Sequence, residues 1–133
     1  MNSELHDLGL ARRKEVLGHT SVENTYSQMD PLQVPFQQIV NEYVWGAVWS
    51  RPGLETQTRC LLTIGMLTAL NRPHELKTHL SAALNNGVTR EQIMETLLHA
   101  NVYCGSPAAV QAFRCMREVF AEHDSQTVSE EKR

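Results

Sequence analysis

Three things are scarce in this chain of 133 residues: cysteine, an excess of charge of one sign, and long apolar runs. The three cysteines, Cys60, Cys104 and Cys115, are odd in number and form no Cys-x-x-Cys pair, which argues against a disulfide framework and a structural zinc site. Twelve Lys and Arg against fifteen Asp and Glu give a net charge of -3, too close to neutral for a broad nucleic-acid surface. We therefore expect reduced thiols, no metal and no nucleic-acid partner.

No apolar run approaches the roughly 20 residues that span a bilayer, and the N-terminal segment carries Glu4 and Asp7 where a signal peptide carries cations. We therefore expect a cytoplasmic protein with no membrane partner. Hydrophobic residues make up 41% of the chain, which suffices for a packed core, and the length fits one domain. We assign that domain to residues 1–123 and expect residues 124–133 to form a flexible polar tail, because it has few apolar side chains.

Apolar residues recur at helical spacing and alternating strand patterns are absent, so the sequence predicts an all-α fold of about six helices. The expected helices cover residues 3–17, 31–49, 55–70, 73–85, 89–105 and 106–122. Start signals are Asp30 before a proline and a capping box of Thr89 and Gln92, and Gly87 supplies a C-terminal cap.

Two further segments have a distinct character. Residues 19–29 are polar and aperiodic, which predicts a connection or an arm. The helix over 55–70 is apolar nearly all round, which is typical of a helix at the centre of a core or against another subunit. We therefore expect an oligomer.

The most informative stretch for chemistry lies between residues 71 and 79, where Glu75 and His79 stand four apart and share one helix face. At about 100° per residue, His79 falls about 60° from the apolar Leu76, which predicts a half-buried carboxylate and imidazole. Such a carboxylate fixes the tautomer of the imidazole and raises its pKa, preparing a proton donor or acceptor near neutral pH. The alternative is an exposed pair worth roughly a few tenths of a kcal/mol.

Arginines form the second group. Arg51 precedes a Pro-Gly turn, Arg59 leads into the apolar helix, and Arg72 stands at a helix start. The planar guanidinium matches a carboxylate, which is what binding a small dicarboxylic acid requires. Arg59 would need an anionic partner if it were drawn into the core, and both substrate binding and an internal salt bridge would supply one.

Aromatic and thiol side chains give weaker signals. Trp45 and Trp49 lie one turn apart and could wall a pocket, or belong to a core or subunit interface. Tyr103, at a helix end, offers a hydroxyl to a ligand or completes the packing. Cys60 is more typical of a small buried hydrophobe than of a nucleophile, although neighbouring Arg59 is a modest reason for a lowered thiol pKa.

Over residues 36–113 the chain resembles the γ-carboxymuconolactone decarboxylase family. Five blocks in the family's order carry the resemblance, namely residues 43–54, 58–64, 69–79, 85–89 and 102–109. The segment Arg12-Arg13-Lys14-Glu15-Val16-Leu17-Gly18 also resembles the opening of that family.

The resemblance implies an alkylhydroperoxidase D-like helical fold that assembles as a homo-oligomer, usually a hexamer, and works without a cofactor. It also implies decarboxylation of 4-carboxymuconolactone to 3-oxoadipate enol-lactone in protocatechuate catabolism, within the β-ketoadipate pathway. In the redox branch of the superfamily two cysteines precede a histidine that corresponds to His79, and here those positions hold Arg72 and Glu75. A thiol–disulfide pair is therefore missing. Cys60 stands where the family usually has Ser and His74 where it often has an acid, which allows for a different substrate.

From the residues and the resemblance together we predict His79, Glu75 and Arg72 as the catalytic group, with His79 donating a proton and Glu75 orienting it. The predicted substrate-binding residues are Arg51, Arg59, Trp45, Trp49, His74, Cys60 and Tyr103. Either Arg51 or Arg59 would anchor a carboxylate of the dicarboxylate lactone. The alternatives are a related enzyme with another substrate, thiol redox chemistry through Cys60 and Cys104, and a helical oligomerisation module without catalysis.

Overall fold

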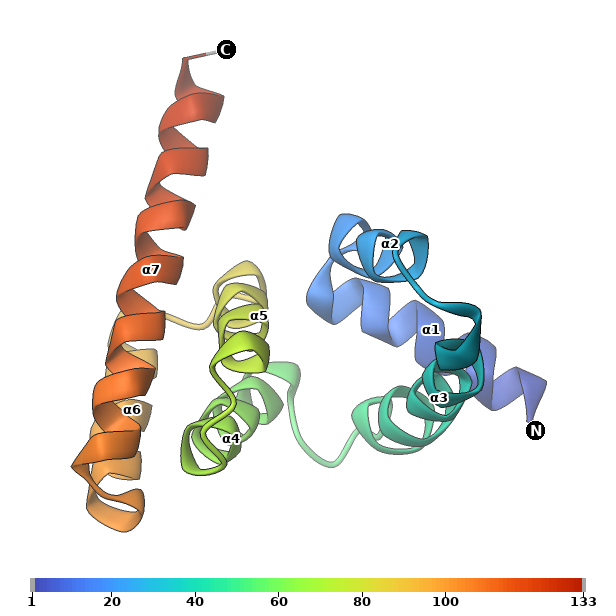
Figure 1. Ribbon diagram of the computed structural model, residues 1–133, viewed down its shortest axis with the longest axis horizontal. Coiled ribbons are helices and arrows are strands. Elements are labelled where there is room, and N and C mark those ends of the chain that lie inside the picture. The colour runs from blue at the N-terminus through green and yellow to red at the C-terminus, as the bar shows by residue number, and fades with distance from the viewer. Residues whose placement is uncertain (1, 133) are drawn as a thin grey trace. The chain divides into compact units, whose positions relative to one another are not determined.

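The computed structural model describes residues 2–132, and within this range the chain forms helices and no strand (Figure 1). Seven α-helices, one short 3₁₀-helix and one π-helix follow each other along the described chain, which confirms the all-α prediction. The described residues form two compact units, divided in the sequence between Arg59 and Cys60. The single domain expected over residues 1–123 stays a prediction. No helix in the described range is both long and apolar enough to cross a membrane.

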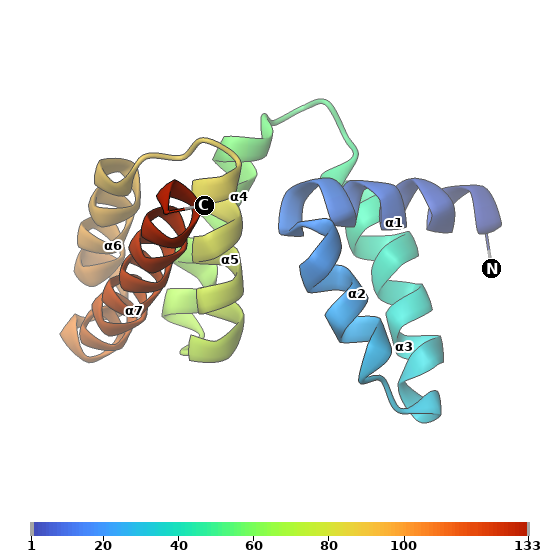
Figure 2. The ribbon, with the colours of Figure 1, turned by 90° about the horizontal axis from the view of Figure 1, so that it is seen from above.

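The first unit contains five helical segments. They are α1 (Ser3–Leu17), α2 (His19–Ser27), η1 (Pro31–Gln33), α3 (Val34–Ile39) and η2 (Val40–Trp49). The side chain of Asp30 accepts a hydrogen bond from the Leu32 amide, and Gln33 completes a capping box, so the predicted start signal is confirmed. α1 packs along η2 and against α2 (Figure 2).

Two glycines allow α1 and η2 to pack backbone against backbone. A Cβ atom on Gly9 of α1 would lie 1.7 Å from the carbonyl oxygen of Asn41, and one on Gly46 of η2 would lie 2.5 Å from the carbonyl oxygen of Leu5. No side chain fits at either position. The close approach therefore depends on the missing Cβ atoms.

A buried polar cluster joins the same two helices. The Arg13 side chain donates from one terminal nitrogen to Oε1 of Gln37 at 2.8 Å and to Oδ1 of Asn41 at 2.9 Å. The amide of Asn41 donates to the hydroxyl of Tyr26 and lies 3.3 Å from Nε2 of His6. Burial lowers the pKa of the Arg13 guanidinium, while its interaction with Tyr26 opposes that shift. The cluster fixes η2 on α1 through directional bonds.

The structure corrects two predictions in the first unit. Residues 19–27 form α2 rather than a connection, because Gly18 turns the chain at a φ of 94° and Val22 anchors the new helix as its buried residue. A single buried Val gives no apolar period for sequence reasoning to detect.

The helix expected over 31–49 is divided among η1, α3 and η2. Apolar residues recur at helical spacing in this range, among them Phe36, Ile39 and Tyr43, and predict a buried face that the structure does not have. Phe36, Ile39 and Tyr43 are exposed, whereas Trp45 and Trp49 are buried. The i→i+5 bonds of a π-helix widen each turn, so residues four apart align better than they do in an α-helix. This places Asn41, Trp45 and Trp49 together on the buried face.

Helix α4 (Thr56–Ala69) begins in the first unit and continues into the second, which also holds α5 (Pro73–Asn85), α6 (Arg90–Cys104) and α7 (Ser106–Glu131). α7 lies against both α5 and α6 (Figures 1 and 2). The core of this unit is formed by buried apolar side chains, among them Ile64, Leu76, Leu80, Ile93, Leu97, Ala112 and Val119. α5 has the predicted bounds, and the capping box of Thr89 and Gln92 starts α6 as expected.

α7 is longer than predicted: it continues to Glu131 instead of ending near residue 122. Arg90 of α6 explains part of this extension, because its guanidinium lies 4.6 Å from the centre of the Phe120 ring and 2.5 Å from Oδ1 of Asp124. The extra turns are mainly polar and carry no apolar period, and the contact that reaches them from α6 is the ion pair between Arg90 and Asp124. Sequence periodicity does not report such a contact.

The faces of α4 differ from one another. Cys60, Ile64 and Thr68 are buried, while Leu62 and Met66 are exposed in the single chain. An exposed apolar face fits the expected oligomer, which stays a prediction.

Candidate active site

The ten residues predicted from the sequence fall into both units. Trp45, Trp49, Arg51 and Arg59 belong to the first unit, whereas Cys60, Arg72, His74, Glu75, His79 and Tyr103 belong to the second.

Helix α5 carries the predicted acid–base pair. Asn71, with a φ of 55°, and Pro73 at the first turn set the start of the helix. The buried Leu76 and Leu80 fix which face points into the core, and His79 beside them is half-buried. Glu75, one turn earlier, is exposed rather than half-buried as predicted. The pair therefore lies at the edge of the core, with the imidazole sheltered and the carboxylate in solvent.

Burial and charge act in opposite directions on this imidazole. Burial lowers the pKa of His79, and the Glu75 carboxylate raises it by a smaller amount, so the pKa lies below its ordinary value of 6.5. The predicted upward effect of Glu75 on this pKa is present, but burial of the ring, which the sequence pattern does not report, outweighs it. At neutral pH the imidazole of His79 is mainly neutral, and its protonated form is a stronger acid than a free imidazolium.

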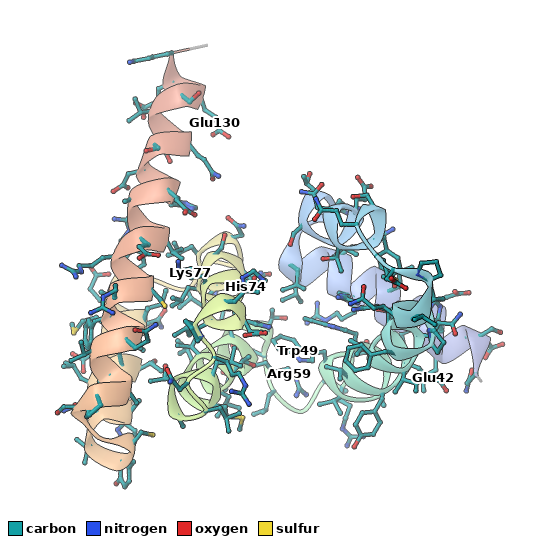
Figure 3. The ribbon with its side chains drawn as sticks, in the orientation of Figure 1. Glu42, Trp49, Arg59, His74, Lys77 and Glu130 are labelled. Atoms are coloured by element: carbon teal, nitrogen blue, oxygen red, sulfur yellow. The ribbon has the colours of Figure 1, made fainter. Side chains whose placement is uncertain are left out.

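Three other predicted residues of the second unit are exposed. Arg72 holds the N-cap position of α5, His74 lies in its first turn, and Tyr103 at the end of α6 is 78% exposed. The Tyr103 ring lies 5.1 Å from the His99 ring, and its hydroxyl donates no hydrogen bond to a described residue. Figure 3 labels His74 on α5 together with Lys77, which extends toward α7 and pairs with Glu118 there.

Cys60 is completely buried on α4, which agrees with a small hydrophobe in the core.

In the first unit, the two tryptophans form one buried surface. Trp45 and Trp49 are 4% and 7% exposed, and their ring centres lie 4.7 Å apart with planes tilted by 31°. Ring centres at this distance are within the range of favourable aromatic pairs. The hydroxyl of Ser50 donates to the carbonyl of Trp45 at 2.8 Å and so secures the end of η2.

The side chain of Arg59 contacts the backbone of Arg51. A terminal nitrogen of Arg59 donates to the carbonyl oxygen of Arg51 at 3.1 Å. The Arg51 side chain is exposed, and its guanidinium donates no hydrogen bond to a described residue. Figure 3 labels Trp49 and Arg59 of this unit. Two guanidinium groups are thus held near one turn, a composition suited to anionic ligands.

A pocket of about 500 Å³ opens beside this turn. It is lined by parts of α1, the end of η2 and the loop after it, and its lining includes Arg12, Trp49, Arg51 and Thr56. Arg12 is not among the site residues predicted from the sequence. Its signal in the sequence is weak, because an Arg three residues before Glu15 is an ordinary helix-surface pair.

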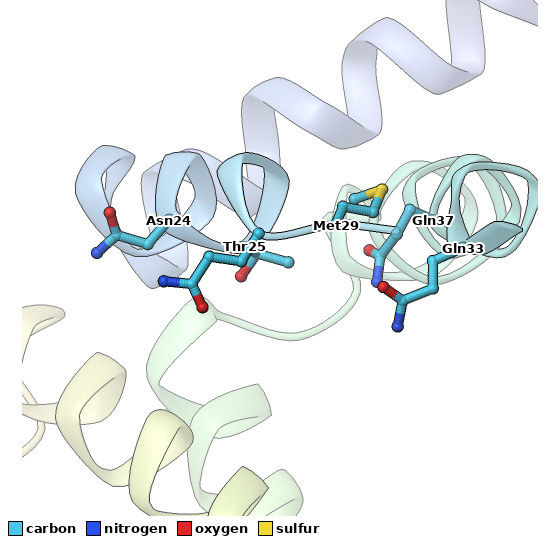
Figure 4. Close-up of a pocket in the computed structure, with 6 residues that line it drawn as sticks. Asn24, Thr25, Met29, Gln33 and Gln37 are labelled. Atoms are coloured by element: carbon cyan, nitrogen blue, oxygen red, sulfur yellow. The ribbon is translucent and has the colours of Figure 1, made fainter. Parts of the chain in front are cut away.

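A second pocket of the first unit, about 290 Å³ in volume, lies between α2 and α3 (Figure 4). Uncharged polar side chains dominate its lining, which comprises Asn24, Thr25, Gln28, Met29, Gln33 and Gln37. None of the predicted residues lines it, and it lacks the cations that a dicarboxylate needs.

These features fit a small helical protein that holds an acid–base pair on one helix and two arginines at one turn. Residues 35–118 match the model of a known family, described as the carboxymuconolactone decarboxylase family. The chain belongs to this family, which confirms the resemblance.

Three relatives add detail. The chain is 42% identical over 123 residues to 4-carboxymuconolactone decarboxylase of Acinetobacter baylyi, an alignment that covers 92% of each protein. It is 44% identical over 115 residues to nitrosuccinic acid decarboxylase npaB of Metarhizium robertsii, covering 84% of this chain and 80% of the relative. It is also 36% identical over 88 residues to an uncharacterized 15.0 kDa protein of Paracoccus denitrificans, covering 64% and 65%. Both relatives that are named for a reaction are decarboxylases, and their identities to this chain are similar.

Proposed function

We propose that the protein decarboxylates 4-carboxymuconolactone to 3-oxoadipate enol-lactone without a cofactor. The observation that carries this proposal is the 42% identity over 92% of both chains to a 4-carboxymuconolactone decarboxylase. The sheltered imidazole of His79 and the arginines at the Arg51 turn support it, since the reaction needs a proton and a holder for carboxylates.

The substrate itself supplies the electron sink. The bond between the ring carbon and its carboxylate breaks, carbon dioxide leaves, and the electron pair of that bond stays on the ring carbon. The pair spreads through the ring double bond into the lactone carbonyl, and a proton then adds to the carbon next to that carbonyl. The protein's tasks are to orient the leaving carboxylate, hold the second one, and deliver the proton.

In this mechanism His79 gives the proton, and Glu75 stabilises its protonated form. Arg51 and Arg59 hold the carboxylates, and Trp45 and Trp49 keep water from the reacting carbon. Arg72 assists the catalytic pair, while His74 and Tyr103 contact the substrate. Cys60, which is completely buried, packs in the core instead of contacting the substrate. Positioned acid catalysis of this kind contributes about 10² to 10⁴ in rate.

A second substrate is favoured by one specific observation, the 44% identity to nitrosuccinic acid decarboxylase. Nitrosuccinic acid is also a small dicarboxylic acid, and the carbon that loses carbon dioxide bears the nitro group. The nitro group takes up the electron pair as the lactone carbonyl does. The same proton donor and the same arginines would serve both acids, so the residues that contact the ring or the nitro group decide between them.

With the lactone as substrate, the protein acts in protocatechuate catabolism through the β-ketoadipate pathway, in the cytoplasm, as a homo-oligomer of the hexameric kind. These assignments rest on the proposed reaction and on the family resemblance.

The test is to incubate the purified protein separately with 4-carboxymuconolactone and with nitrosuccinate, and to measure carbon dioxide release above the rate without protein. In deuterated water, nuclear magnetic resonance of the product should show one deuteron on the carbon next to the lactone carbonyl. We expect the larger kcat/KM with the lactone. Release from nitrosuccinate alone would transfer the assignment to the second substrate, and release from neither would refute both.

A further inference from the structure

The side chain of Arg12 connects three separate segments of the first unit. Its Nε donates to the carbonyl oxygen of Trp49 at 3.2 Å, one terminal nitrogen donates to Oε2 of Glu15 at 2.8 Å, and the other donates to Oγ1 of Thr56. All three nitrogens of the guanidinium are therefore engaged. Glu15 neutralises its charge, so Arg12 is poorly suited to bind a substrate carboxylate itself.

The Trp49 and Thr56 contacts lie at the two ends of one loop. Trp49 is the last residue of η2 and Thr56 is the first residue of α4, and the loop between them contains Arg51. Arg12, from α1, thus fixes the ends of the loop relative to each other. The Arg51 amide donates to the carbonyl of Val48 at 3.1 Å, which ties down only the start of the loop.

The same loop carries one of the two proposed carboxylate anchors and contacts the other. Arg59 stands one turn into α4 and donates to the carbonyl oxygen of Arg51. The spacing of the two guanidinium groups therefore depends on how the end of η2 meets the start of α4. That junction is where Arg12 acts.

We propose that Arg12 is a positioning residue that sets the spacing of Arg51 and Arg59 for a substrate with two carboxylates. This inference rests on the proposed function, because it assumes that the arginines hold a dicarboxylic acid. An arginine is needed at this place because its planar group donates in several fixed directions at once. A lysine carries the same charge but presents a single nitrogen, which cannot bridge Trp49 and Thr56 in the same geometry.

Two variants and one control test the inference. Arg12→Lys keeps the charge and loses the bridge, and Thr56→Val removes the acceptor at one end with little change in shape. Lys14→Gln is the control, since it removes a cation from the same helix whose ammonium group forms no ion pair with the described residues. Circular dichroism checks that each variant is folded.

The first readout is kinetic. Misplaced arginines weaken binding of substrate and transition state alike, so Arg12→Lys should raise KM about tenfold while kcat stays within about twofold. Thr56→Val should raise KM in the same direction by less, and Lys14→Gln should leave both constants unchanged. Inhibition should separate positioning from general disruption: a dicarboxylate such as glutarate should bind more weakly to Arg12→Lys, and a monocarboxylate such as butyrate should be affected less.

The second readout does not depend on activity. Amide hydrogen exchange across residues 50–56 should be faster in Arg12→Lys and Thr56→Val than in the wild type and in Lys14→Gln. Unchanged exchange in both variants would overturn the inference, as would an unchanged KM in an active Arg12→Lys protein. If the wild type decarboxylates neither acid, the proposed function fails, and faster exchange together with weaker glutarate binding in the variants would still support the role of Arg12.

Discussion

Glu75 and His79 lie one turn apart on α5, and burial of the imidazole outweighs the carboxylate in setting the pKa of His79. Burial disfavours the charged ring, while Glu75 favours it. The result is a histidine that is mainly neutral at pH 7 and that, when it carries a proton, is a stronger acid than a free imidazolium. Only a small fraction of the protein molecules carries this proton at pH 7, but in those molecules the imidazolium transfers it readily.

The first prediction concerns Glu75→Gln. Removing the carboxylate leaves burial unopposed, so the pKa of His79 should fall further below its ordinary value of 6.5. The measurement is titration of the imidazole by nuclear magnetic resonance in both proteins. A pKa of His79 that stays the same or rises would show that Glu75 does not act on the ring.

The second prediction concerns stability and pH. The folded state holds His79 with a lowered pKa, so between the two pKa values the unfolded chain binds more protons than the folded one. The stabilisation by the neutral ring is complete above about pH 6.5 and is lost as the pH falls from there through the folded pKa. Urea unfolding of the wild type and His79→Asn should show a difference in unfolding free energy that shrinks on acidification from pH 7 toward 5. A difference that grows would contradict the direction of the shift.

The third prediction concerns the proton itself. His79→Asn removes the donor with little change in volume, so kcat for the proposed substrate should fall at least about a hundredfold while the fold is kept. Steady-state kinetics with the lactone measure it, and circular dichroism verifies the fold. His123→Asn on α7, a half-buried histidine that is not among the proposed site residues, is the matched control and should retain normal kinetics. Near-normal kcat in His79→Asn would remove this residue from the mechanism.

Much of the second unit could be predicted from the sequence because its signals are local. Pro73 and the stripe of Leu76 and Leu80 define the bounds and the buried face of α5, and a capping box defines the start of α6. The spacing of Glu75 and His79 on one face also follows from helix geometry alone. The net pKa of His79 does not, since it depends on how deeply the neighbouring elements bury the ring.

The first unit was harder to predict because distant residues determine it. A period of 3.6 residues misplaces the buried face of η2, where π-helical bonds align Trp45 with Trp49. The contact between Arg12 and Thr56 joins residues 44 positions apart, and the local sequence around either residue gives no sign of the other. Periodicity and caps thus locate helices, while the contacts that arrange the turn at Arg51 are visible only in three dimensions.

The fourth prediction concerns the glycine contact between α1 and η2. In Gly9→Ala the new Cβ atom would lie 1.7 Å from the backbone oxygen of Asn41, so the helices must separate. We expect a loss of about 1–3 kcal/mol in unfolding free energy, the usual cost of overpacking. Gly65→Ala on α4 is the matched control, because the new Cβ atom would meet nothing within 4 Å. This substitution also replaces a glycine that weakens the helix, so it should not lower the unfolding free energy. Urea unfolding compares the three proteins, and equal stability of Gly9→Ala and the wild type would show that the close approach is not required.

The fifth prediction concerns the proposed carboxylate anchors. Arg59→Gln loses a charged group that would hold a substrate carboxylate, together with its hydrogen bond to the carbonyl of Arg51. Hydrogen bonds to charged groups contribute about 1.5–3 kcal/mol, so KM for the dicarboxylic acid should rise by roughly one to two powers of ten.

The change in kcat separates two roles for Arg59. If Arg59 holds the carboxylate that stays on the product, ground state and transition state lose the same interaction, and kcat should change little. If it contacts the leaving carboxylate, kcat should fall with kcat/KM. Arg59→Lys keeps the charge without the planar group and should lie between the wild type and Arg59→Gln, while Arg117→Gln on the exposed surface of α7 controls for the loss of one positive charge. Unchanged kinetics in Arg59→Gln would assign the anchoring role to Arg51 alone, and Arg51→Gln would then be the variant in which KM rises.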